Sequence, residues 1–274
     1  MGLEFLTPFG VAFGRCALGA ITLLIYAKVR RISFPRERHI WLKLWFVALV
    51  LNIIPGILFA FAEVRVTSVL AGIINATTPL ATLIVILVAF REEKPKNFQL
   101  LGLLIGGLGV LTVLGVWKGL GHNNVVGIIA LLGAVTCYGI SFPFTKKYVI
   151  PLGLKPEAAA TMQISLAALT LLPFYLYDGI AKDEYRIGPI LAMIALGAVG
   201  TGFAYIWNFS IIASAGSSIA STVTYVTPVI AVFVGWLFKG EHITWNQPLG
   251  AGVVIFGAAI SQGRFRQISQ KLKA

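Results

Sequence analysis

The chain has 274 residues, of which 58% are hydrophobic and only 12% are charged. A typical globular domain carries about 25% charged residues, so a soluble globular fold is excluded because so few charges cannot cover its surface. The formal net charge of +12 is compatible with nucleic-acid binding or with a membrane protein, and the positions of the basic residues distinguish these classes.

Apolar segments long enough to cross a bilayer follow one another along the whole chain. One span needs about 20 apolar residues, and residues 187–238 contain no Asp, Glu, Lys or Arg, which predicts two spans broken near residues 215–218. The same criterion predicts nine spans. In chain order they cover residues 6–27, 40–62, 67–90, 98–117, 126–147, 156–177, 187–210, 217–238 and 245–262. The connections are short, and no soluble domain fits between the spans.

The basic residues are concentrated on one side of the predicted membrane. Most Lys and Arg residues follow the first, third, fifth and ninth spans, and few lie in the other loops. Because positive charge is retained in the cytoplasm, the chain is predicted to be a multi-pass protein of the inner (plasma) membrane with a cytoplasmic C-terminus. The basicity is therefore explained by topology, and no nucleic-acid partner is predicted.

The first four spans are repeated in sequence as the last four. The matched positions are Leu6-Thr7-Pro8 with Leu154-Lys155-Pro156, Arg15 with Gln163, Asn75 and Pro79 with Thr224 and Pro228, Glu92 with Glu241, Gly102 with Gly250, and Gly109 with Gly257, at offsets of 148 or 149. The offset corresponds to five helices, an odd number, so each helix crosses the membrane in the opposite direction from its mate. Secondary carriers with such inverted repeats bind substrate near the bilayer midplane.

The fifth span begins the second repeat and has no partner in the first. This predicts a helix upstream of Met1, with a natural nine-helix protein as the alternative. The predicted fold class is an all-α membrane protein, an inverted five-plus-five helix repeat bundle in which nine of ten transmembrane helices are present. The predicted domains are residues 1–118, the first repeat without its first helix, and residues 119–274, the second repeat.

Polar residues at mid-depth are the candidates for substrate binding, because a polar group in hydrocarbon costs several kcal/mol unless it is paired. Arg15 is the only strong charge so deep in a span; it either binds carbonyls of neighbouring helices or contacts a ligand. Gln163 lies at the equivalent depth. The full set of candidates is Arg15, Asn52, Asn75, Thr78, Tyr138, Ser141, Gln163, Tyr205, Trp207, Asn208, Tyr225 and Thr227.

Pro79 and Pro228 lie near the middle of their spans and are the predicted hinges. Proline removes one helical hydrogen bond, and within a membrane the freed carbonyl needs a side chain, water or ligand. The polar residues just before each proline either supply that bond or line a wet cavity, and both alternatives stay open. The glycines Gly102, Gly106, Gly250, Gly252 and Gly257 are predicted to allow close helix packing.

No arrangement of residues typical of catalysis is found at a plausible depth in the predicted spans. Every Asp, Glu and His falls in a loop or at a helix end, and the two cysteines show neither a disulfide framework nor metal-ligand spacing. The chain is therefore predicted to be no enzyme and to need no metal or other cofactor.

Two sets of residues resemble a known family. They are the helix starts Leu6-Thr7-Pro8 with Arg15 and Leu154-Lys155-Pro156 with Gln163, and the stretch from Ser217 through Thr227-Pro228 and Gly240-Glu241 to Gln247-Pro248-Leu249-Gly250. These residues resemble the EamA-type branch of the drug/metabolite transporter superfamily, over essentially the whole chain. The resemblance implies ten helices in an inverted five-plus-five repeat, cytoplasmic termini and a central cavity. It also implies export or exchange of amino acids and related metabolites, and aromatic amino-acid exporters are one such group.

The predicted function is that of a secondary-type transporter. It would export or exchange small metabolites, amino acids or related amphiphilic compounds, by alternating access around a midplane cavity. The predicted partners are a small-molecule substrate and the lipid bilayer. The alternatives are an inactive or scaffold-type truncated membrane protein, and a carrier of sugar phosphates or nucleotide sugars. A phosphate group calls for two or more basic residues, whereas only Arg15 is available.

Overall fold

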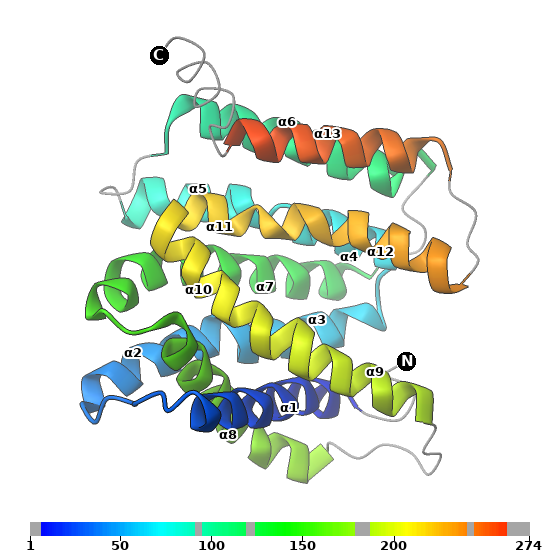
Figure 1. The fold of residues 1–274 in the computed structure, drawn as a ribbon. Helices are drawn as coiled ribbons and strands as arrows, with labels where there is room; N and C mark the ends of the chain where they lie inside the picture. The colour runs from blue at the N-terminus through cyan, green and yellow to red at the C-terminus, as the bar shows by residue number, and fades with distance from the viewer. Residues whose placement is uncertain (1–6, 91–94, 119–123, 179–186, 240–243, 262–274) are drawn as a thin grey trace. The chain divides into compact units, whose positions relative to one another are not determined.

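The computed structural model describes residues 7–90, 95–118, 124–178, 187–239 and 244–261, and every regular element in these ranges is helical (Figure 1). The helices are α1 (Pro8–Val29), α2 (Arg38–Ala48), η2 (Leu49–Ile53), α3 (Ile54–Glu63), α4 (Ser68–Asn75), α5 (Thr78–Ala89), α6 (Asn97–Leu114), η3 (Val116–Lys118), α7 (Val125–Phe144), η4 (Thr145–Val149), η5 (Ile150–Leu152), α8 (Pro156–Asp178), α9 (Ile187–Gly197), η6 (Ala198–Phe203), α10 (Ala204–Ala215), α11 (Ser217–Ser221), α12 (Val223–Lys239) and α13 (Asn246–Ser261).

The helices confirm the all-α membrane fold class. Each predicted span coincides with one helix or with a run of consecutive helices. Within the described residues, seven segments are long and apolar enough to cross a membrane; α12 and α13, with 17 and 16 residues, are slightly shorter. The predicted break near residues 215–218 is confirmed at Gly216, whose φ of 90° separates α10 from α11.

The chain forms two compact units, which we describe separately. Unit 1 contains Met1–Val64 and Phe144–Ser214, and unit 2 contains Arg65–Pro143 and Ala215–Ala274. Each unit therefore takes helices from both predicted repeats. The domain boundaries 1–118 and 119–274, which follow the repeats, stay a prediction.

In unit 1, the repeat mates α1 and α8 pack against each other in antiparallel orientation. The ring of Phe9 stacks on that of Phe174, with centroids 5.8 Å apart, and Phe13 stacks on Tyr175 at 4.5 Å. Further along α1, a Cβ added to Gly19 would lie 3.3 Å from Cγ2 of Ile164. Because numbers rise along α1 as they fall along α8, the mates run in opposite directions, as an inverted repeat requires.

Two π-helical turns occupy equivalent positions in the two repeats. η2 joins α2 to α3, and η6 joins α9 to α10. The repeat offset of 149 maps Leu49, where η2 begins, onto Ala198, where η6 begins. η6 packs against α1, and η2 packs against α8, the mate of α1. π-Helical turns inside α-helices are rare and are often found at functional sites, so the middle of these two spans is a candidate site.

In unit 2, the repeat mates α6 and α13 are in close contact through glycines. A Cβ on Gly102 would lie 2.6 Å from the Gly257 carbonyl oxygen, and a Cβ on Gly250 would lie 2.7 Å from that of Gly109. Exchanging each glycine for its repeat mate turns the first contact into the second, which is the signature of a local two-fold axis. The predicted close packing is confirmed for Gly102, Gly250 and Gly257, and Gly109 packs in the same way. It is wrong for Gly252, which has no neighbour within 4 Å of an added Cβ because it points away from α6.

The ends of α6 and α13 are fixed by polar contacts of the same kind. Oε1 of Gln99 accepts from the Lys96 backbone N–H at 2.7 Å, and Oε1 of Gln247 accepts from the Thr244 N–H at 3.0 Å. Each glutamine thus satisfies a backbone donor at the start of its helix. Nδ2 of Asn246 donates to the carbonyls of Thr112 and Val113 at 3.0 and 3.1 Å, which ties the start of α13 to the end of α6.

Candidate functional site

An amide pair joins α8 to the π-helical turn η2 in unit 1. Nε2 of Gln163 donates to Oδ1 of Asn52 at 2.5 Å. Both side chains are buried, with 0% of Gln163 and 3% of Asn52 exposed. The structure therefore brings together two predicted binding residues, one from each repeat.

The amide pair lies near the middle of α1. A Cβ on Gly19, close to the centre of that helix, would lie 3.3 Å from both Cγ2 of Ile164 and the backbone nitrogen of Gly202. The residues preceding these two neighbours are Gln163 and Thr201, and Arg15 lies one turn before Gly19 on α1. We call Arg15, Asn52, Gln163 and Thr201 the mid-depth polar layer.

Several polar atoms of this layer have no hydrogen-bond partner among the described residues. They are Nδ2 of Asn52, Oε1 of Gln163 and Oγ1 of Thr201, and Thr201 is fully buried. Leaving such a group unsatisfied costs about 1–3 kcal/mol, and native proteins contain few of them. The layer therefore offers unused donors and acceptors within a membrane span, which is what a binding site for a polar group needs.

α10 supplies three further predicted residues in different environments. The hydroxyl of Tyr205 donates to the Leu51 carbonyl in η2 at 3.4 Å, so Tyr205 contacts the same π-helical turn as Gln163. Oδ1 of Asn208 is buried without a partner among the described residues. Trp207 is 63% exposed and lies on the outer face of the helix. Their roles in substrate binding stay predictions.

Lys146 makes a contact that the sequence does not predict. Its Nζ donates to the carbonyls of Ile212 and Ala213 at 3.2 and 3.1 Å, in the last turn of α10. A cation at a helix C-terminus interacts favourably with the unpaired carbonyls there. Lys146 therefore fixes the end of α10 to η4. No local sequence signal distinguishes this lysine from those that only set the topology.

In unit 2, Pro79 coincides with a real interruption of the third span. α4 ends at Asn75, and α5 begins at Thr78. Pro79 has no N–H for the carbonyl four residues earlier, which is that of Asn75. The hydroxyl of Thr78 donates to this carbonyl at 2.7 Å, and the Thr78 side chain is fully buried. Of the two alternatives for the polar residues before the proline, Thr78 fulfils the first, because it satisfies the freed carbonyl.

This contact predicts a measurable stability loss for Thr78→Val. Valine keeps the shape of the side chain but removes the donor, so the Asn75 carbonyl is left unsatisfied and the protein loses about 1–3 kcal/mol. The melting temperature of the detergent-purified protein measures this. Thr136→Val is the matched control, because Thr136 is exposed and its hydroxyl donates to Leu132, a carbonyl four residues earlier in an uninterrupted helix. Equal melting temperatures for the two variants would contradict the role given to Thr78.

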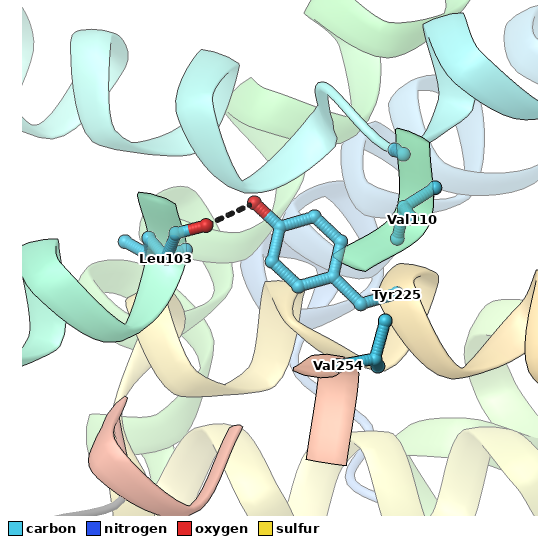
Figure 2. Close-up of a cluster of buried hydrophobic side chains, with 5 residues drawn as sticks. Leu103, Val110, Tyr225 and Val254 are labelled. Atoms are coloured by element: carbon cyan, nitrogen blue, oxygen red, sulfur yellow. Dashed lines mark hydrogen bonds between the residues drawn. The ribbon is translucent and has the colours of Figure 1, made fainter. Parts of the chain in front are cut away.

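Tyr225 is buried in the core of unit 2. Figure 2 shows its ring between Leu103, Val110 and Val254, with a hydrogen bond from its hydroxyl to the Leu103 carbonyl. That bond is 3.0 Å long, and only 1% of the side chain is exposed. A Cβ on Gly106 would lie 2.7 Å from Cδ2 of Tyr225, so the ring fills the space that this glycine leaves on α6. These contacts favour a structural role for Tyr225, three residues before Pro228 in α12.

The remaining candidates of unit 2 lie on α4, α7 and α12. The hydroxyl of Ser141 donates to the carbonyl of Tyr138, one turn earlier in the same helix, at 2.8 Å. Asn75 is half-buried at the end of α4, and Thr227 is exposed. Substrate contact by these residues and hinge motion at both prolines stay predictions. The predicted match of Glu92 with Glu241 lies outside the described residues.

The fold and the polar layer together define a polytopic helical membrane protein whose repeat mates pack antiparallel. The EamA-like transporter family matches residues 1–115 and 125–262, so the chain belongs to this family. Its members are multi-pass membrane transporters of small molecules and are not enzymes.

The chain is similar to several known proteins over most of its length. It is 26% identical to the uncharacterized transporter YdfC of Bacillus subtilis (strain 168) over 267 residues, which cover 95% of this chain and 83% of YdfC. It is also 26% identical to the threonine/homoserine exporter RhtA of Escherichia coli (strain K12), over 90% of this chain and 79% of RhtA. A crystal structure with 17% sequence identity has the same fold, with a TM-score of 0.74 over 93% of this chain and 88% of the other.

Proposed function

We propose that this EamA-family protein exports or exchanges amino acids or related amphiphilic metabolites across the inner membrane by alternating access. The observation that carries the proposal is the mid-depth polar layer, whose unused donors and acceptors lie within the membrane spans of unit 1. A polar substrate that pairs them recovers the free energy lost by their burial. The similarity to a threonine/homoserine exporter supports amino acids as the substrate class.

The chemistry of the layer favours amino acids over phosphorylated sugars. A phosphate group is best bound by two or more basic side chains. The layer, as defined above, contains one, Arg15, together with two amides and one hydroxyl. Aromatic amino acids are one subgroup of the proposed substrates. A panel of substrates distinguishes transport of these compounds from transport of small polar amino acids.

The direct test is counterflow in proteoliposomes that contain the purified protein. Vesicles are loaded with unlabelled L-threonine, L-homoserine, L-phenylalanine or L-tryptophan, and entry of the same labelled compound is measured. We expect transient accumulation for at least one of them and none in protein-free vesicles. Flux of a sugar phosphate but of no amino acid would contradict the proposal, and the absence of any flux would favour the scaffold alternative.

The predicted cytoplasmic C-terminus belongs to the same proposal. It lies outside the described residues, and its support is the concentration of Lys and Arg in the loops on that side. An alkaline phosphatase fused after Ala274 should be inactive, whereas a fluorescent protein at the same position should be bright. The opposite result would mean that the C-terminus lies on the other side of the membrane. A helix upstream of Met1 stays a prediction.

A further inference from the structure

The amide pair of Asn52 and Gln163 leaves two hydrogen-bonding groups unused, and the role that we infer for them rests on the proposed function. Each side-chain amide has one carbonyl and one NH2 group. A single bond between two amides uses one carbonyl and one N–H, so one NH2 group and one carbonyl stay free whichever way the amides are turned. In the structure these are Nδ2 of Asn52 and Oε1 of Gln163, neither of which has a partner among the described residues.

The unused groups are complementary to a zwitterion. Nδ2 of Asn52 is a donor and suits a carboxylate, whereas Oε1 of Gln163 and Oγ1 of Thr201 are acceptors and suit an ammonium group. The described acidic residues of unit 1 all lie at helix ends, at Glu37, Glu63, Glu157 and Asp178. The only formal charge in the layer is that of Arg15. A zwitterion carries both complementary groups, because its carboxylate accepts from the Asn52 amide and its ammonium group donates to the Gln163 carbonyl.

The amides are contributed by different parts of the chain. Gln163 is on α8, from the second repeat, and Asn52 is on η2, from the first. π-Helical turns interrupt the regular ladder of backbone hydrogen bonds and are therefore local points of adjustment. A ligand that inserts its head group between the amides can replace their direct bond with bonds to both side chains.

We propose that the Asn52–Gln163 pair, with Thr201, binds the zwitterionic α-amino and α-carboxyl head group of the transported amino acid. The Asn52 amide donates to the carboxylate. The Gln163 carbonyl accepts from the ammonium group, and the Thr201 hydroxyl is a second acceptor. The direct amide bond is then the ligand-free arrangement of this site.

The test replaces both amides with apolar side chains of similar size, as Asn52→Leu with Gln163→Met. Replacing both partners of a buried polar pair by apolar groups is nearly neutral or stabilising, and it also removes the two unused groups. We expect the ligand-free melting temperature of the double variant to be unchanged or higher. The dissociation constant for L-threonine and L-phenylalanine, from ligand-induced thermal shifts, should rise about tenfold or more.

Asn246→Leu is the matched structural control. Its amide is also buried but donates to two backbone carbonyls, so its removal should lower the melting temperature by several degrees and leave the dissociation constants unchanged. A similar loss of stability in the double variant would mean that the amide pair is structural, and it would overturn the inference.

Ligand charge provides the second arm of the test. The methyl ester of L-threonine is cationic and lacks the carboxylate, whereas N-acetyl-L-threonine is anionic and lacks the ammonium group. Both should bind the wild type much more weakly than L-threonine does. Equal binding of the ester, or wild-type affinity in a stable double variant, overturns the head-group site and leaves amino-acid transport standing. If wild-type protein neither transports nor binds any amino acid of the panel, the proposed function fails, and this inference fails with it.

Discussion

Gly257→Ala is expected to destabilise the protein strongly, because it places a methyl group against the backbone of α6. The added Cβ would lie 2.5 Å from the Gly106 nitrogen and 2.8 Å from the Gly102 carbonyl oxygen. These are backbone atoms of α6, so the overlap cannot be relieved by a side-chain rotation, and the two helices have to separate. We expect a loss of at least about 3 kcal/mol and a fall in melting temperature of about 10 °C in detergent.

Gly252→Ala is the control for this prediction on the same helix. Its Cβ would have no neighbour within 4 Å. Alanine is also a better helix former than glycine by about 0.5–1 kcal/mol, so this variant should be slightly more stable than the wild type. If Gly257→Ala melts at the wild-type temperature, the close approach of α6 and α13 does not exist in the membrane protein as purified.

Tyr225→Ala is expected to have the second large effect, again on stability. Truncating a buried aromatic side chain costs about 3–5 kcal/mol through lost burial and a residual cavity. Tyr225→Phe removes only the bond to the Leu103 carbonyl and should cost about 1 kcal/mol. Because the hydroxyl is bonded inside unit 2, amino-acid counterflow by the Phe variant should stay close to the wild-type rate. A severe loss of flux in a Phe variant of normal stability would instead place the hydroxyl on the substrate.

A double-mutant cycle shows whether Tyr225 occupies the space beside Gly106. Alone, Gly106→Ala should be destabilising, because its Cβ would lie 2.7 and 2.8 Å from ring atoms of Tyr225. In the Tyr225→Ala background the same change should be harmless, since no atom outside that ring lies closer than 3.8 Å to the added Cβ. We expect a coupling free energy of about 1–3 kcal/mol from melting data. Additive effects would contradict the contact between the Tyr225 ring and Gly106.

The predicted candidates divide between structural and functional environments, and local sequence could not separate them. Thr78 and Gln163 are both fully buried polar residues in membrane spans. The Thr78 hydroxyl is bonded to the carbonyl freed by Pro79, whereas Gln163 keeps one acceptor unused. The partner of Thr78 is local, but that of Gln163 is distant in sequence, because Gln163 meets Asn52, 111 residues away.

Sequence patterns alone predict the helical segments, the break near Gly216 and which helices are repeat mates. These features depend on composition and on identities at a constant offset, and a run of apolar residues in a bilayer has to form a helix to satisfy its backbone. The opposite directions of α6 and α13 follow from the same offset, because five helices reverse the direction of the chain, whereas their contact through glycines is known only from the structure.

The positions of the π-helical turns, the contact between the two amides and the structural role of the Tyr225 ring are known only from the folded structure. A π-helical turn has no composition of its own; η2 and η6 share a position in the repeat but few residues. Tyr225 and Tyr205 both lie deep within apolar segments, and their roles differ because of the carbonyl that each hydroxyl reaches on another helix. Such contacts depend on side-chain directions across helices, which are set by packing and not by the local pattern of residues.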